Sequence, residues 1–111
     1  RYREAVAPLR QLDQLHSGKD RETVRSLVFC LSVSGARAEA LPHARRLVRL
    51  APGDASARVM LGDLAGQLGY EKKDRALLAE ARTAYEKGFA LNPKDARAGL
   101  KRAIAPGATR R

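Results

Sequence analysis

The sequence has very little cysteine and few aromatic residues. Its 111 residues include one cysteine, no tryptophan and only 5% aromatic residues. A single cysteine excludes an internal disulfide. The longest apolar run, residues 27–31, is far shorter than the roughly 20 residues that a membrane-spanning helix needs. So few aromatic rings also leave little surface for stacking nucleic-acid bases.

The residues that are abundant favour helices and a basic surface. Hydrophobic residues make up 44% of the chain and charged residues 31%, with Ala, Leu and Arg the most frequent types and few β-branched residues. The length allows one small domain or a few repeats. The formal net charge of +10 would suit an anionic partner, such as an acidic peptide, nucleic acid or a membrane surface. It is also typical of an arginine-rich, bacterial-like composition with a solvated surface.

One sequence unit occurs twice, in residues 40–52 and 81–93. Each copy opens with a small Ala, carries small or apolar residues four, seven and eight positions later, and ends with a Pro twelve positions after the Ala. The Ala allows close approach of a neighbouring helix, and the later positions lie on the same helical stripe. Pro cannot continue the helix. The duplicated unit therefore predicts an array of helical repeats.

The periodicity predicts a chain of short helices separated by polar turns. Apolar residues recur at helical spacing throughout. Gly18 is a predicted helix stop, and Pro8 is expected in the first turn of its helix, where proline is tolerated. The predicted helices are residues 1–16, 21–34, 37–50, 55–68, one that ends at residue 91, and 95–104. The residues predicted to cap helix N-termini are Asp20, Asp54 and Asp74. Because the chain begins at Arg1 as if within a helix, we expect a fragment of a larger protein.

These residues resemble the tetratricopeptide repeat family, which pairs two antiparallel helices in about 34 residues. The second unit carries the more complete set of matching residues: Leu61, Gly62, Ala81, Tyr85, Gly88 and Pro93. The first unit is more degenerate, with matches at Leu27, Gly35, Ala40 and Pro52 and with Val28, Ala44 and Leu47 in place of the usual residues.

The resemblance implies an all-α fold, a right-handed α-solenoid of antiparallel helix pairs with about six helices. It covers residues 1–104, divided into a half unit (1–17), a first unit (21–53), a second unit (54–94) and a terminal helix (95–104), followed by a tail (105–111). The two repeat prolines, Pro52 and Pro93, are 41 positions apart, about seven more than the family repeat. The extra residues fall near 69–75. We expect them to lengthen both helices, because Glu and Lys there are good helix formers.

The resemblance also implies a protein-interaction scaffold that binds a peptide or helix of a partner in a concave groove. Arg25, Arg97 and Lys101 occupy the positions of a basic carboxylate clamp, whereas Phe29 and Met60 replace its asparagines, so an acidic or mixed peptide is the expected ligand. The register places these residues in the groove: Glu22, Arg25, Phe29, Ser32, Ser56, Val59, Asp63, Gln67, Arg97 and Lys101.

Two other classes of function stay open. An arginine cluster in residues 37–49 could bind nucleic acid or another polyanion, although no recognisable nucleic-acid motif accompanies it. Exposed terminal helices could instead make the chain a self-assembly module and a homo-oligomer.

No enzyme activity, metal or cofactor is predicted. Cys30 is interpreted as a core residue, and His16 and His43 have no carboxylate or thiol at ligand spacing. The sequence leaves the compartment open between cytoplasm and periplasm.

Overall fold

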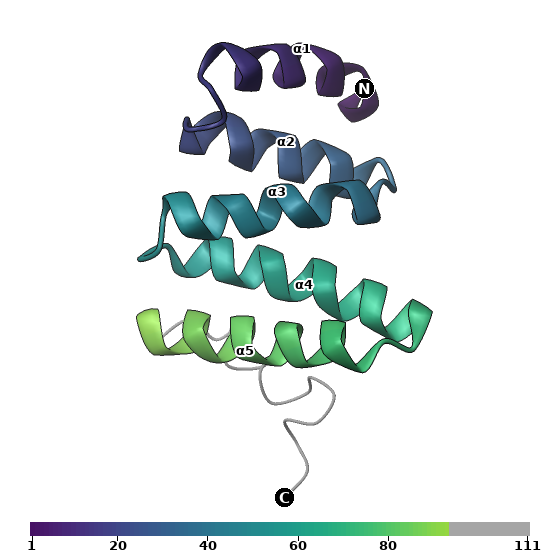
Figure 1. Ribbon diagram of the computed structural model, residues 1–111, viewed down its shortest axis with the longest axis vertical. Helices are drawn as coiled ribbons and strands as arrows, with labels where there is room; N and C mark the ends of the chain where they lie inside the picture. Colours follow the sequence, from purple (N-terminus) through teal and green to yellow (C-terminus); the bar gives the residue numbers. More distant parts are fainter. Residues whose placement is uncertain (94–111) are drawn as a thin grey trace, which may run out of the picture. The chain divides into compact units, whose positions relative to one another are not determined.

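The computed structural model describes residues 1–93, and within them the chain is all α-helical (Figure 1). The five helices are α1 (Tyr2–Leu15), α2 (Arg21–Val33), α3 (Arg37–Leu50), α4 (Ala55–Lys72) and α5 (Arg75–Leu91). The predicted all-α class is confirmed. The sixth predicted helix, residues 95–104, lies outside the described residues. The chain divides into two compact units, Arg1–Pro52 with α1 to α3 and Gly53–Arg111 with α4 and α5.

Aspartates begin three of the helices, as predicted. The Asp20 carboxylate accepts a 3.2 Å hydrogen bond from the Thr23 amide at the start of α2. Asp54 does the same for α4, and Asp74 accepts from two amides of α5. Each carboxylate satisfies amide donors that have no partner within the helix and places a negative charge at the positive end of the helix dipole.

The turns of the first unit depend on glycines with positive φ. Gly18 (φ +71°) follows α1, and Gly35 (φ +89°) follows α2, in the left-handed region that glycine adopts without a steric penalty. The prediction for Pro8 was wrong. Since α1 begins at Tyr2, Pro8 lies in its second turn. Its exposed position explains why the helix tolerates it, because water can reach the carbonyl that loses its amide partner.

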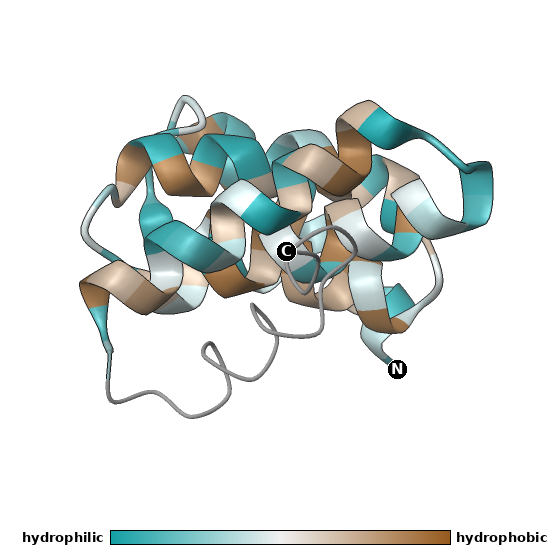
Figure 2. Cartoon of the chain, turned by 90° about the horizontal axis from the view of Figure 1, so that it is seen from below, coloured by the Kyte–Doolittle hydropathy of each residue, from teal (hydrophilic) through white to brown (hydrophobic). Residues whose placement is uncertain are grey.

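The core of the first unit lies where α2 packs against both α1 and α3. The predicted apolar stripe of α2 is buried, and Cys30 is buried next to it, as expected. The small residues Ala40 and Ala44 of α3 are fully buried, which lets the two helices approach closely. Hydrophobic and hydrophilic residues alternate along the helices, as amphipathic packing requires (Figure 2). The largest fully buried side chains of this unit are Val24, Leu27, Val28, Leu31 and Leu47.

The second unit is a pair of longer helices, so the expectation for the extra residues is confirmed. α4 has 18 residues and α5 has 17, whereas α2 has 13 and α3 has 14. Only Lys73 and Asp74 separate α4 from α5. The added length is packed, because a Cβ on Gly69 would lie 3.0 Å from the backbone nitrogen of Leu78. The insertion therefore extends the helix pair and forms no loop.

Candidate functional site

The exposed face of α2 carries the residues that the family register places in the groove. Thr23, Val24, Leu27, Val28, Cys30 and Leu31 are buried, which leaves Glu22, Arg25, Phe29 and Ser32 on the side away from the core. Glu22 and Phe29 are exposed, and Arg25 and Ser32 are half-buried. The Ser32 hydroxyl donates a 2.7 Å hydrogen bond to the Val28 carbonyl. The predicted residues of α2 therefore share one solvent-facing stripe.

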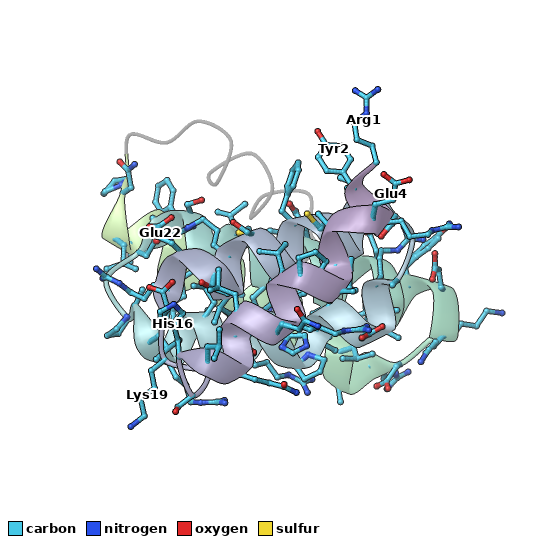
Figure 3. The ribbon with its side chains drawn as sticks, turned by 90° about the horizontal axis from the view of Figure 1, so that it is seen from above. Arg1, Tyr2, Glu4, His16, Lys19 and Glu22 are labelled. Carbon is cyan, nitrogen blue, oxygen red and sulfur yellow. The ribbon has the colours of Figure 1, made fainter. Side chains whose placement is uncertain are left out.

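Tyr2 of α1 joins this stripe through an aromatic contact. Its ring meets that of Phe29 edge to face, with centroids 5.3 Å apart and an interplanar angle of 84°, a favourable aromatic geometry. Tyr2, Phe29 and Val33 are each about half exposed, at 49%, 48% and 50%. We call these three residues the aromatic patch. Sequence reasoning missed Tyr2 because it lies on a different helix, 27 positions before Phe29. Figure 3 shows Tyr2 projecting from the start of α1.

Two shallow depressions lie beside the aromatic patch. One, of about 440 Å³, is lined by residues from the start of α1 and the end of α2: Arg1, Tyr2, Arg3, Glu4, Val33 and Ser34. The other, of about 450 Å³, lies between α1 and the α2–α3 turn and is lined in part by Arg3, Arg10, Ser34 and Glu39. Both are open to solvent and share Arg3 and Ser34, so they are adjacent.

In the second unit, the exposed face of α4 is mostly polar. Ser56 and Gln67 are exposed, and Asp63 accepts a 2.7 Å hydrogen bond from the Tyr85 hydroxyl of α5. Val59, which the register also placed in the groove, is only 2% exposed and packs at the buried Gly88 of α5. Its side chain is part of the core, and the half-exposed Met60 next to it lies nearer the stripe. Two further predicted groove residues, Arg97 and Lys101, lie outside the described residues.

A charged cluster joins α1 to α3. The Arg46 guanidinium donates two hydrogen bonds of 2.9 Å to the two carboxylate oxygens of Asp13, and one of 2.8 Å to the Gly18 carbonyl. It also donates to Nδ1 of His43 at 2.6 Å. We call these four residues the Arg46 clasp. The nearby turn carries His16 and Lys19, and Glu22 follows in the first turn of α2 (Figure 3). Arg46 belongs to the arginine cluster that was considered for polyanion binding. Its guanidinium group instead forms hydrogen bonds within the protein.

The clasp shifts the pKa of two of its members. The hydrogen bonds from Arg46 are the main reason why the pKa of the Asp13 carboxyl lies below its ordinary value. Burial lowers the pKa of His43, and the positive charge of Arg46 lowers it further, while the Asp13 carboxylate opposes both effects. His43 therefore holds its neutral form, in which Nδ1 can accept a hydrogen bond.

Two further features are absent from residues 1–93: a membrane-spanning helix and a group of metal ligands. No helix there combines the length and apolarity needed to cross a membrane. No group of three or more His, Cys, Asp or Glu side chains is placed to hold a metal ion in this part of the chain.

Comparison with known protein families gives a match that covers most of the chain. Residues 1–105 match the model of a protein family described as Tetratricopeptide Repeats-Sensor. No curated protein matches the chain.

Proposed function

Because the chain belongs to the Tetratricopeptide Repeats-Sensor family, and tetratricopeptide repeats are in general protein-interaction modules, we propose that it binds a segment of a partner protein. In each unit the candidate docking surface is the solvent-facing stripe of the first helix of the pair, α2 in the first unit and α4 in the second. The family register adds Arg97 and Lys101 to the groove, a prediction that falls outside the described residues. The protein acts as a scaffold without catalysis, and a sensor role would consist of recognising that partner.

The observation that carries the proposal is the exposed Phe29 on the α2 stripe. A large aromatic side chain that is 48% exposed adds apolar surface that packing within the fold does not use. Aromatic residues of this kind are frequent anchors in protein interfaces. Phe29 lies at a position where the family register expects a groove residue, and the half-buried Arg25 and Ser32 lie on the same face.

The α4 stripe would add polar contacts. Its Asp63 carboxylate is held in place by the Tyr85 hydroxyl, which reduces the entropy lost when a ligand orders that side chain. Gln67 is exposed one helical turn further along the same face. The α2 stripe thus favours an apolar ligand residue and the α4 stripe favours polar ones, so a peptide of mixed character is the expected ligand.

The test is selection from a random dodecapeptide library against the intact chain. Enriched peptides are labelled and titrated by fluorescence anisotropy against wild type and the double variant Phe29→Ala/Gln67→Ala. We expect Kd to rise by about tenfold or more, corresponding to at least about 1.4 kcal/mol. The matched control is Leu15→Ala, which removes a side chain that is 78% exposed on another part of α1. Equal binding by wild type and the double variant, or no enrichment at all, would overturn the proposal.

Self-association is a second candidate, favoured by the apolar surface of α1. Leu12 and Leu15 are 40% and 78% exposed near its C-terminal end, and exposed apolar ends of repeat arrays promote association. Sedimentation over a concentration series tests it, since a strict monomer at high concentration excludes a homo-oligomer.

A further inference from the structure

We propose that the aromatic patch and the basic depressions beside it form a single anchoring site, specific for a partner segment in which an apolar side chain is flanked by acidic residues. The inference rests on the proposed function. It specifies the chemistry of the ligand that binds beside the α2 stripe. It places the anchor where the start of α1 meets the end of α2, within the first unit.

The apolar half of the site is built from two helices. Tyr2 and Phe29 meet edge to face, and Val33 lies one turn beyond Phe29 on α2. About half of each of the three side chains is open to solvent. The contact between Tyr2 and Phe29 limits the freedom of both rings, so a ligand that covers them loses less side-chain entropy than it would on two independent aromatic residues. An aliphatic or aromatic side chain fits such a surface.

The polar half of the site is the wall that the two depressions share. Arg3 and Ser34 line both of them. In the depression next to the aromatic patch, the charged residues are Arg1, Arg3 and Glu4, which is two guanidinium groups against one carboxylate. Because Tyr2 and Glu4 are two positions apart on a helix, about 200° around its axis, they leave α1 in different directions (Figure 3). Because Arg1 and Arg3 outnumber Glu4, the depression next to Tyr2 has a net positive charge.

The neighbouring depression shows which cation is available. Arg10 and Glu39, which both line it, form an ion pair. Arg3 makes no ion pair with another residue of the described range 1–93. A positive charge without a partner, beside an exposed apolar patch, is complementary to a carboxylate that follows an apolar side chain. Such rim charges contribute mainly to specificity and to the rate of association, while the buried apolar side chain contributes most of the affinity.

The occupant follows from these two halves. A purely apolar segment would leave Arg3 beside it without a counter-charge, and a purely acidic segment would leave the aromatic patch uncovered. A short stretch of a partner protein with one large apolar residue and one or more Asp or Glu within a few positions satisfies both.

The experiment uses the dodecapeptides selected on the intact wild-type chain, each synthesised also with its Asp and Glu changed to Asn and Gln. Their binding is measured for Tyr2→Ala and Arg3→Glu. The controls are Leu15→Ala for the loss of an exposed apolar side chain and Arg21→Glu for the charge change. We expect enrichment of an apolar residue next to acidic residues, and a Kd about tenfold higher for each site variant. Neither control should change Kd by more than about twofold.

The amide forms of the peptides test the charge directly. They should bind wild type more weakly and should no longer distinguish wild type from Arg3→Glu, because the effects of two interacting groups are not additive. If the selected peptides respond to Phe29→Ala/Gln67→Ala but not to Tyr2→Ala or Arg3→Glu, this inference fails while the proposed function stands. If Arg3→Glu has the same effect on the acidic and amide forms, the acidic chemistry is wrong. Absence of any selected binder overturns both proposals.

Discussion

The Tyr85 hydroxyl of α5 donates a 2.7 Å hydrogen bond to Asp63 of α4, and the ring of the same tyrosine packs against Gly62. The Tyr85 ring lies so close to Gly62 that a Cβ there would be 2.5 Å from Cε1 of the ring. Burial, with the Asp63 carboxylate as a further cause, raises the pKa of Tyr85 above its ordinary value, so the hydroxyl keeps its proton and remains a donor. A small residue and a hydrogen-bonded ring together fix the distance between the two helices.

Removal of the Tyr85 hydroxyl tests the polar part of this arrangement. Tyr85→Phe keeps the ring but leaves the Asp63 carboxylate without this donor, so we expect a loss of about 1–2 kcal/mol in the free energy of unfolding. Urea unfolding followed by circular dichroism measures it. Tyr70→Phe is the control, because Tyr70 is 77% exposed and the change should be close to neutral. Equal stability of the two variants would show that the hydrogen bond contributes nothing.

Alanine substitution at two glycines of α4 should give effects of opposite sign. Gly62→Ala places a methyl group against the buried Tyr85 ring and should destabilise by about 1–2 kcal/mol, after allowance for the better helix propensity of Ala. At Gly66 the same methyl group would lie 3.5 Å from Cβ of Ala81, an ordinary contact. Gly66→Ala should therefore stabilise by about 0.5–1 kcal/mol. Urea unfolding measures both effects. If both substitutions changed the free energy of unfolding in the same direction, the packing described for this face would be wrong.

The Arg46 clasp should couple α1 to α3 more strongly than the exposed ion pair between the same helices. A double-mutant cycle with Asp13→Asn and Arg46→Met should give a coupling energy of about 1 kcal/mol or more, because both side chains are largely buried, at 14% and 22% exposed. The same cycle for Arg10 and Glu39, at 48% and 45% exposed, should give less than about 0.5 kcal/mol. A larger coupling in the second cycle would reverse the expected ranking.

The clasp also makes stability depend on pH. The pKa of His43 is lower in the folded chain than its ordinary value of 6.5, so the unfolded chain binds the proton more readily. The contribution of neutral His43 is complete above about pH 6.5 and is lost as the pH falls from there through the folded pKa. Protonation would set an imidazolium against Arg46, with Arg10 adding further repulsion and Asp13 opposing it.

The measurement compares urea unfolding of wild type and His43→Gln at pH 7.5 and pH 5.0. Wild type should lose more stability than the variant between the two values. A further loss at lower pH should come from Asp13, whose folded pKa is depressed and whose contribution disappears as the pH falls through that value. An identical pH dependence of wild type and variant would remove His43 from this account.

The sequence predicted those features that depend on local chemistry or on helical spacing. Asp20, Asp54 and Asp74 begin their helices because a carboxylate before a helix satisfies free amides, a rule that involves only three or four neighbouring residues. The buried stripes of α2 and α3 followed from periodicity in the same way. The solvent-facing stripe of α2 was also predictable, because the residues that are not on the buried face of a helix must face solvent.

Other features depend on contacts between separate helices, which periodicity does not determine. Tyr2 reaches Phe29, and Asp13 reaches Arg46, only because α1 packs beside the next helix pair. The prediction that Val59 lies in the groove was wrong for a related reason. Gly88 of α5 has no side chain, so Val59 packs against it in the core. Knowledge of the helix pairing, in addition to helix positions, is needed for residues of this kind.

The tight packing at Gly69 has a consequence for how the longer helix pair behaves. An insertion of seven residues in a surface loop usually creates a site where proteases cut and where amide protons exchange quickly. Here the added residues continue both helices, and the two backbones remain in contact near their ends. We therefore expect slow hydrogen exchange up to the last turn of α4, and a stiff edge in place of a hinge.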